Sequence, residues 1–181
     1  MIVDPDAELV ARVARGDRAA AQTLMRRHLP KMLGLARRML GGSVEAEDAV
    51  QDAFMRLWTH AERWRPGQAK FETWLYRVTL NKCFDRLRRR PVSPLDDAME
   101  VQDPAPSPES ELERAALSRQ IEVALRALPD RQRAAIQLCH YQECGNIEAA
   151  EILGISVEAL ESLLSRGRRT LRARLLHLKD T

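Results

Sequence analysis

Seven of the eight aromatic residues of the chain lie between positions 54 and 84, among many basic residues. The rings are Phe54, Trp58, Trp64, Phe71, Trp74, Tyr76 and Phe84, and the cations are Arg63, Arg65, Lys70, Arg77, Lys82, Arg86 and Arg88. Rings stack on unpaired bases, and basic side chains neutralise phosphates. The mixture therefore indicates a surface that could hold single-stranded nucleic acid.

The rings also have a simpler use, because aromatic side chains often form the core of a small helical domain. That interpretation is favoured for Phe54, Trp58 and Phe84. Recognition residues tend to lie on loops beside a rigid scaffold, and the helical pattern breaks at 65–68. We therefore expect four rings beside this break to be exposed: Trp64, Phe71, Trp74 and Tyr76.

A second basic set follows a run with the spacing of a helix-turn-helix. Residues 146–163 read N-I-E-A-A-E-I-L-G-I-S-V-E-A-L-E-S-L, with Ala150 on the first helix and Gly154 at the turn. Asn146 and Ser156 are each placed to cap one helix. Ordinary helical hairpins share this spacing, but here guanidinium groups that can contact phosphates follow it: Arg166, Arg168, Arg169, Arg172 and Arg174. The pattern favours a helix that meets a duplex.

Two carboxylates on the same helix oppose this. Glu158 and Glu161 repel phosphate, and a carboxylate there can only accept a hydrogen bond from a base such as cytosine. We expect them to limit the affinity for DNA.

Cys139, His140 and Cys144 lie close together in the sequence and could bind a metal ion. Two thiols and an imidazole within six residues can chelate zinc, but a fourth ligand is not evident, and buried structural cysteines are common. A metal or redox sensor is therefore a minor alternative, and we expect no metal and no cofactor.

Helices must position all of these residues. Apolar residues recur with the 3.6-residue period, and no run shows the alternation of a strand. In the first half, Asp6 is expected to cap the first helix, which ends at Gly16-Asp17, where the next helix starts. A further helix begins at Pro30 and ends at Gly41-Gly42. Ser43 caps the helix after it, and the last helix of this half runs from about Phe71 to Arg90. In the second half, helices run from about Glu111 to Leu128 and from Asp130 to Tyr141 before the helix-turn-helix. The predicted fold is all-α.

The two halves are separated by an acidic, proline-rich segment. Residues 91–108 hold five of the nine prolines and no glycine. The net charge is +7 for residues 1–90, −6 for 91–117 and +2 for 118–181. A segment of this composition cannot hide a core, so we predict a flexible linker between two small domains.

Composition excludes several classes of protein. An apolar content of 45% supports packed cores, while no apolar run approaches the ~20 residues of a membrane span. The start of the chain is acidic where a signal peptide is basic, and three scattered cysteines do not form a disulfide framework. We expect a cytoplasmic protein. An enzyme is disfavoured, because none of the four histidines is accompanied by a Ser or Cys nucleophile at the spacing of a known catalytic motif.

The order of these features resembles the extracytoplasmic-function (ECF, group IV) sigma factors of bacterial RNA polymerase, which keep only the domains called two and four. The resemblance covers nearly the whole chain. It implies sigma region 2 at residues 1–90, an acidic linker at 91–111 and sigma region 4 at 112–181.

In region 2.2 of that family, an acidic helix followed by Gln and Phe binds the clamp helices of the polymerase β′ subunit. The matching stretch here is A-E-D-A-V-Q-D-A-F-M-R-L-W. The resemblance implies that Asp48, Gln51 and Asp52 bind polymerase, with Phe54 as a packing residue.

Regions 2.3 and 2.4 of the family melt the −10 promoter element and capture a flipped base. The stretch F-E-T-W-L-Y-R-V-T-L-N-K-C-F-D-R-L-R-R-R resembles them, and the loop 64–70 resembles the one that makes the base pocket. Asn81 is expected to bond a base edge, and Asp85 to orient basic neighbours. The implied −10 residues are Trp64, Lys70, Trp74, Tyr76, Arg77, Asn81, Asp85, Arg86 and Arg88.

The second half resembles region 4, whose helices meet the β-subunit flap and read the −35 element. The start, A-L-P-D-R-Q-R-A-A-I-Q-L, and the tail, S-L-L-S-R-G-R-R-T-L-R, carry this resemblance. Ala159, Glu161 and Leu163 stand where Thr, Lys and Arg are usual in the family. The expected −35 residues are Ser156, Glu158, Ser162, Arg166, Arg168, Arg169 and Arg172.

The resemblance implies a transcription initiation factor that performs no covalent chemistry. It binds polymerase core and promoter DNA, does not insert into a membrane, and is commonly held inactive by an anti-sigma factor. The linker is then either a nucleic-acid mimic that threads toward the RNA exit channel or a plain tether. The alternative from another class is a stand-alone helix-turn-helix regulator, which would need neither Asp48, Gln51 and Asp52 nor the aromatic cluster.

Overall fold

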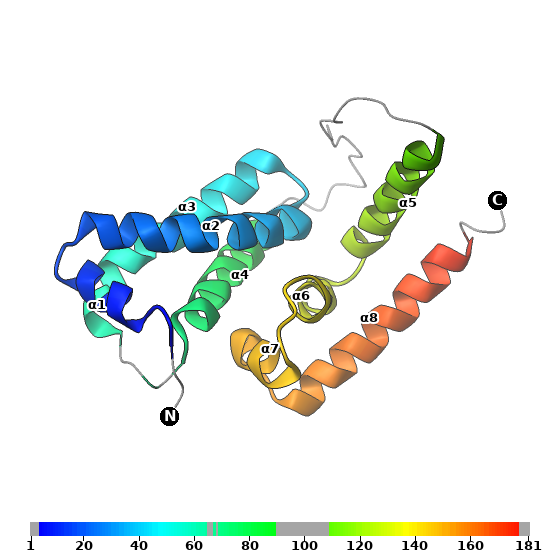
Figure 1. Ribbon diagram of the computed structural model, residues 1–181. Helices are drawn as coiled ribbons and strands as arrows, with labels where there is room; N and C mark the ends of the chain where they lie inside the picture. The colour runs from blue at the N-terminus through cyan, green and yellow to red at the C-terminus, as the bar shows by residue number, and fades with distance from the viewer. Residues whose placement is uncertain (1–3, 65–66, 68, 90–108, 178–181) are drawn as a thin grey trace.

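The computed structural model describes residues 4–64, 67, 69–89 and 109–177, which form helices and no strand (Figure 1). The first half contains α1 (Ala7–Ala14), α2 (Arg18–Leu40), α3 (Ser43–His60), the 3₁₀ helix η1 (Ala61–Arg63) and α4 (Phe71–Arg89). The second half contains α5 (Glu109–Arg126), α6 (Asp130–Ile136), the π-helical turn η2 (Gln137–Tyr141), α7 (Asn146–Leu153) and α8 (Val157–His177). The all-α prediction is confirmed, while residues 90–108 of the predicted linker region lie outside the described residues.

The first half is a bundle in which α2, α3 and α4 pack on one another. Helix α3 shows why: its buried residues recur every three or four positions and so form one apolar face. They are Ala46, Ala49, Val50, Ala53, Phe54 and Leu57. Because half of them are alanines, neighbouring backbones can approach closely, and the residues between them are left on the outer face.

Helix α2 is longer than predicted, because it continues through Pro30 instead of beginning there. Proline lacks the N–H that bonds back to the previous turn, which normally kinks or ends a helix. Here Leu24, His28, Met32 and Leu35 are buried on both sides of Pro30, and this packing favours one continuous helix.

The predicted caps are correct in part. The Asp17 carboxylate accepts hydrogen bonds from the N–H groups of Ala19 (2.9 Å) and Ala20 (3.1 Å) and so caps α2. The prediction for Asp6 was wrong: its carboxylate makes no cap bond, because it is buried against Arg27 and His28 Nε2 (2.7 Å). The cap at Ser43 was also wrong, since Ser43 is the first helical residue and its hydroxyl donates to Glu47 (3.0 Å).

In the second half, α6 and α8 cross at a glycine. A Cβ on Gly167 would lie 2.7 Å from Cδ1 of Ile136, so only glycine fits without a shift of this buried side chain. Gly154 takes the left-handed conformation (φ 64°) between α7 and α8, as the turn requires. The Ser156 hydroxyl accepts from the N–H of Ala159 (3.2 Å), whereas the cap predicted at Asn146 is wrong because Asn146 lies inside α7.

The two halves contact each other, and their buried apolar residues form one cluster. Helix α7 lies against α4 in Figure 1, while α6 and α5 contact α2. No helix in the described part of the chain combines the length and the apolar character that a membrane span needs.

Candidate nucleic-acid and protein interfaces

The outer face of α3 carries the acidic residues expected to bind protein. Asp48 and Gln51 are exposed, while the alanines on the opposite face are buried. Asp52 is one turn from Asp48 and pairs with Arg86 (3.1 Å) and Lys82 (3.6 Å) of α4, which leaves 47% of its side chain exposed. The structure therefore places the three residues on one face, with Asp52 partly neutralised.

Two apolar side chains extend this face, and sequence reasoning missed them. Met55 is 62% exposed and Trp58 is 48% exposed, so the prediction that Trp58 belongs to the core was wrong. Met55 follows Asp52 by three residues and Gln51 by four, and Trp58 follows Gln51 by seven, which puts both side chains on the same side of the helix as these polar residues. That spacing was a usable signal, because Phe54 and Leu57 already fill the buried face. Exposed large apolar residues beside charges are typical of a protein interface.

Rings from three segments surround a cavity of about 290 Å³ between α3, η1 and α4. The rings of Phe71 and Trp74 stack with centroids 5.7 Å apart, and that of His60 lies 6.3 Å from Trp74. Trp64 and Arg77 also line the cavity. A cavity of this size with stacked rings and a guanidinium at its edge can accept a planar group such as a base.

Two of the four rings expected to be exposed are buried instead. Phe71 is fully buried, and its N–H donates to the Asp4 carboxylate (2.7 Å), which anchors the start of α4. Tyr76 is 2% exposed, and its hydroxyl donates to Gln142 of the second half (2.9 Å). Burial raises the pKa of the Tyr76 phenol above its ordinary value. The expectation failed for Tyr76 because the second half covers it, and for Phe71 because the ring packs against His28 within the first half.

The other predicted residues of α4 lie mainly on its exposed face. Arg77, Asn81 and Arg88 are exposed, and Lys70 is exposed just before the helix begins. Asp85 is paired with Arg88, the arrangement expected of a residue that orients a cation. Arg86 is held by Asp52 instead and is less accessible. The structure thus brings Trp74, Arg77, Asn81 and Arg88 to one side of α4, since they are three, four and seven residues apart.

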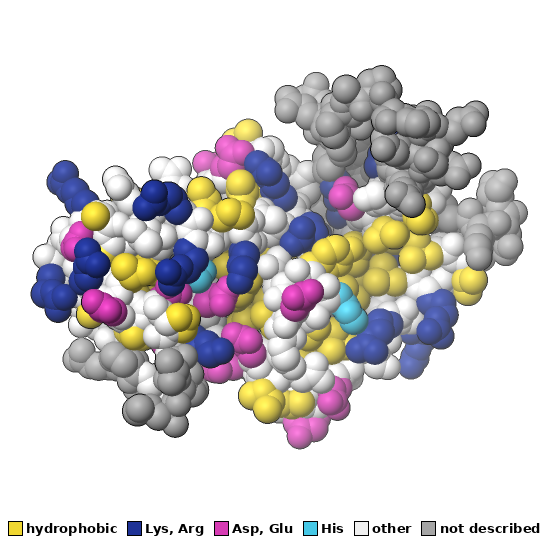
Figure 2. Space-filling view, in the orientation of Figure 1, with side chains coloured by type: hydrophobic (Ala, Val, Ile, Leu, Met, Phe, Trp, Pro, Cys, Tyr) yellow, Lys and Arg dark blue, Asp and Glu magenta, His cyan; other side chains and the backbone are white. Residues whose placement is uncertain are grey.

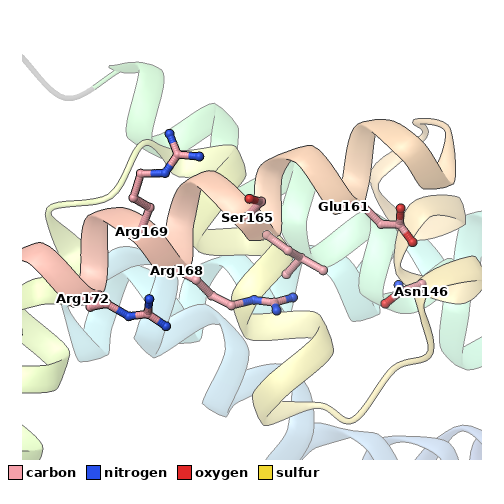
Figure 3. Close-up of a pocket in the computed structure, with 7 residues that line it drawn as sticks. Asn146, Glu161, Ser165, Arg168, Arg169 and Arg172 are labelled. Carbon is pink, nitrogen blue, oxygen red and sulfur yellow. The ribbon is translucent and has the colours of Figure 1, made fainter.

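Three arginines of α8 line a second cavity of about 520 Å³. Arg168, Arg169 and Arg172 lie at one end, and Glu161 and Asn146 lie at the other (Figure 3). Among the described residues, no carboxylate forms an ion pair with any of the three arginines. Figure 2 shows basic side chains along this helix and over the first half. Exposed guanidinium groups of this kind can contact phosphates.

The remaining predicted residues of α8 lie near its start or on a neighbouring side. Ser162 accepts from Arg166 Nη2 (3.0 Å), which fixes that arginine along the helix. Glu158 is exposed, and its own N–H and the Ser156 hydroxyl lower the pKa of its carboxyl. Ser156 is occupied by capping. The residues predicted to contact the −35 element therefore form two groups. Three arginines line the cavity, and the other four residues lie nearer the start of the helix.

The cysteines gain no support as a metal site. No group of three potential ligands among His, Cys, Asp and Glu occurs in the described residues. Cys144 is buried, which raises the pKa of its thiol to about 12, and Cys139 lies 4.0 Å from the Asn146 amide oxygen. A thiol that stays protonated is a poor metal ligand.

Comparisons with known proteins agree with both halves. Residues 24–91 match the family described as Sigma-70 region 2, and residues 118–171 match Sigma-70, region 4. The chain is 37% identical to the ECF RNA polymerase sigma factor SigM of Mycobacterium tuberculosis, over 97% of this chain and 87% of SigM. It is 34% identical to the ECF sigma factor SigE of Mycolicibacterium smegmatis, over 88% of this chain but only 64% of SigE.

A solved structure is also similar over both halves. CnrH in complex with the cytosolic domain of CnrY matches with a TM-score of 0.73 and 30% identity, over 95% of this chain and 97% of that chain. A stand-alone helix-turn-helix regulator is not favoured, because the relatives match the first half as well as the second. The chain belongs to the ECF RNA polymerase sigma factors, a family of transcription initiation factors that are not enzymes.

Proposed function

We propose that this sigma factor binds RNA polymerase core through the outer face of α3. The observation that carries the proposal is that Asp48 and Gln51 are exposed, while the apolar residues on the opposite side of the same motif, such as Val50 and Phe54, are buried. Asp52 shares the face, and Met55 and Trp58 supply the apolar area that a protein interface needs at its centre. The partner surface on this proposal is the β′ clamp helices.

The −10 element is bound on α4 and at the ring-lined cavity. An unpaired base stacks near Trp64 and Trp74, Asn81 bonds a base edge, and the basic residues neutralise phosphates. The supporting observations are the stacked rings, the cavity volume and the shared face of α4. The phosphate contacts on this proposal come from Lys70, Arg77, Arg86 and Arg88, with Asp85 orienting Arg88, and Tyr76 joins them once it is uncovered.

The −35 element is contacted by α8. Arg168, Arg169 and Arg172 are the phosphate contacts, since their guanidinium groups face open space. The start of the helix, with Ser156, Glu158, Ser162 and Arg166, approaches the bases. Exposed apolar residues on α5, Leu117 and Val123, offer a surface for the β flap. The domains on this proposal are residues 1–90 and 112–181, joined by the linker 91–111.

The chain itself performs no covalent chemistry and needs no cofactor. Promoter opening costs ~1.4 kcal/mol per stacked step, and binding of extruded bases offsets part of this cost. We place the protein in the cytoplasm, where polymerase is. An anti-sigma factor is the proposed regulator, by analogy with CnrH, whose structure contains the cytosolic domain of CnrY.

Charge reversal on α3 tests the proposal. Asp48→Lys with Asp52→Lys is expected to weaken binding to purified core polymerase at least tenfold, measured by fluorescence anisotropy. Glu8→Lys with Glu143→Lys is the matched control, because it makes the same change in charge at two exposed carboxylates that lie outside α3. Circular dichroism checks that the variants stay folded. Unchanged core binding by the double variant would refute the proposed interface.

A further inference from the structure

The ring-lined cavity between α3, η1 and α4 offers few groups that can accept a hydrogen bond from a bound base. Thr73 is buried, and its hydroxyl already donates to a glutamate of α7 (3.0 Å). Arg63 and Arg77 line the cavity, but a guanidinium group only donates. Among the described lining residues, His60 and the Glu151 carboxylate remain as side chains that can accept.

The hydrogen bonds of Thr59 determine which nitrogen of His60 carries the proton. The Thr59 hydroxyl oxygen lies 3.2 Å from the Arg56 carbonyl oxygen and 3.1 Å from His60 Nδ1. A carbonyl oxygen can only accept, so the hydroxyl donates its one hydrogen to Arg56. The hydroxyl oxygen then accepts from the Nδ1–H of His60. Because a neutral imidazole carries one N–H, Nε2 is left with a free lone pair.

His60 is half-buried and lies beside the aromatic stack that we propose holds an unpaired base. The centroid of its ring is 6.3 Å from that of Trp74, and the two planes are inclined by 36°. Trp74 in turn stacks on Phe71, and all three rings line the cavity. The imidazole is therefore placed to meet the edge of a base that enters beside Trp74.

An acceptor at this edge distinguishes two chemical classes of base. Cytosine and adenine carry an exocyclic amino group where thymine, uracil and guanine carry an oxygen. The amino group can donate to a free lone pair, whereas an oxygen brings a second acceptor and leaves both groups without a partner, which costs free energy. Stacking on an aromatic ring tolerates every base, so selectivity has to come from the edge.

We propose that His60 makes the cavity selective for an unpaired base with an exocyclic amino group, cytosine or adenine, over a base with an oxygen at that position. Nε2 of His60 accepts the hydrogen bond from the amino group. Thr59 is a positioning residue, because it keeps the imidazole proton on Nδ1. This inference rests on the proposed function of the cavity and adds the chemical class of base that it selects.

The test compares two labelled single-stranded 12-mers, one of deoxycytidine and one of deoxyuridine. They share the backbone and the size of the ring and differ at the edge that carries the amino group or the oxygen. The full chain is bound to core polymerase at about pH 8, where free histidine is neutral, and core polymerase alone gives the background. Fluorescence anisotropy is expected to show at least fivefold tighter binding of the deoxycytidine strand.

Substitution of His60 should remove this preference. His60→Phe keeps a ring beside Trp74 but has no acceptor, so the ratio of the two affinities should fall below twofold, mainly through weaker binding of deoxycytidine. His60→Gln supplies an oxygen that can accept and should recover part of the ratio. Circular dichroism checks that the variants stay folded.

Substitution of Thr59 tests its positioning role. Thr59→Val removes the hydroxyl that accepts from Nδ1, so the imidazole proton can occupy Nε2 instead. The ratio should fall at least twofold while binding of deoxyuridine does not weaken; a merely structural role would weaken both strands alike. The matched control is Thr23→Val, since the Thr23 hydroxyl donates to the Ala19 carbonyl in α2 (2.9 Å), away from the cavity. It should behave like the wild type.

The outcomes separate this selectivity from the function on which it rests. Equal binding of the two strands by the wild type, or an unchanged ratio in His60→Phe, would overturn the role of His60. A ratio lost in Glu151→Gln but kept in His60→Phe would do the same and assign the selectivity to the carboxylate. Trp74→Ala should weaken both strands. If it weakens neither, the proposed −10 function of the cavity fails together with its selectivity; if it weakens both while His60→Phe keeps the ratio, only the selectivity fails.

Discussion

The two arginine-bearing helices, α4 and α8, present their charges in opposite ways. On α4 the cations are held by carboxylates: Arg86 by Asp52 and Arg88 by Asp85. They also lie beside stacked rings and a cavity. On α8, Arg168, Arg169 and Arg172 extend from the helix, and no ion pair involves them in the described ranges.

The difference bears on what each helix can recognise. Side chains fixed by ion pairs and rings lose little freedom on binding and favour a ligand of defined shape, such as an extruded base. Mobile guanidinium groups neutralise phosphates of any sequence, so their contribution depends on salt. We therefore expect α4 to discriminate and α8 mainly to anchor.

Among single substitutions, replacement of the Trp74 ring should have the largest effect on the difference between α4 and α8. Trp74→Ala removes a half-buried ring that stacks on Phe71, so the free energy of unfolding should fall by about 2 kcal/mol. Single-strand affinity should fall at least tenfold, because base stacking is worth ~1–3 kcal/mol. Urea denaturation and anisotropy with a labelled oligonucleotide measure the two effects.

The matched change on the other helix is Arg172→Ala, which removes an exposed side chain. It should change stability by less than ~0.5 kcal/mol and leave single-strand binding intact. Trp74→Phe should recover most of both losses. Equal losses for Trp74→Ala and Arg172→Ala would mean that the two helices do not differ as described.

The salt dependence of duplex binding should sharpen the contrast. Arg168→Ala with Arg172→Ala removes two phosphate contacts, so the slope of log K against log salt should become shallower by about 2. Filter binding of a promoter fragment by the polymerase holoenzyme, at several salt concentrations, measures this slope. Arg119→Ala, an exposed arginine on α5, is the control. A slope that the double variant does not alter would show that these guanidinium groups lie away from phosphates.

The features of α8 were more predictable than those of α4, for a physical reason. The turn at Gly154, the cap at Ser156 and the exposed arginines depend on residues close in sequence. Such features can be predicted from the sequence, because capping and backbone conformation depend on residues within a few positions of each other. The all-α fold followed from periodicity in the same way.

Several of the errors concern contacts between distant segments. Tyr76 is buried by Gln142, 66 residues away, and the Asp6 carboxylate bonds to Arg27 and His28 instead of capping α1. Pro30 stays within α2 because the packing around it outweighs its local preference. Trp58 is exposed because α3 already fills its buried face with smaller residues. Spacing along one helix indicates only the last of these outcomes, the exposure of Trp58; the others depend on packing against other segments.

A double-mutant cycle examines what holds α8 in place. Gly167→Ala should destabilise the protein by about 1 kcal/mol, because the new methyl group would lie 2.7 Å from Cδ1 of Ile136. Ile136→Val removes that atom and alone should cost about 1 kcal/mol. The double variant should be no less stable than Ile136→Val, and urea denaturation measures the coupling. Simple additivity would show that the crossing of α6 and α8 does not depend on this contact.

The smallest expected effect is a pH-dependent change in thermal stability when the carboxylate at the start of α2 or of α8 is replaced. At the start of α2, the N–H of Ala20 and then Arg12 lower the pKa of Asp17 below its ordinary 3.8. A carboxylate with a depressed pKa in the folded state stabilises above its ordinary pKa, and this stabilisation is lost as the pH falls through the folded value. Asp17→Asn keeps a capping oxygen but not the charge, so it should melt below the wild type at pH 7, and the difference should shrink below pH 3.8. Glu158→Gln on α8 should show the same trend more weakly, because the pKa of Glu158 is lowered by its own N–H and the Ser156 hydroxyl rather than by an arginine. Thermal melts by circular dichroism from pH 7 to pH 3 measure both, and a constant difference in Tm across that range would show that the Asp17 charge does not stabilise α2.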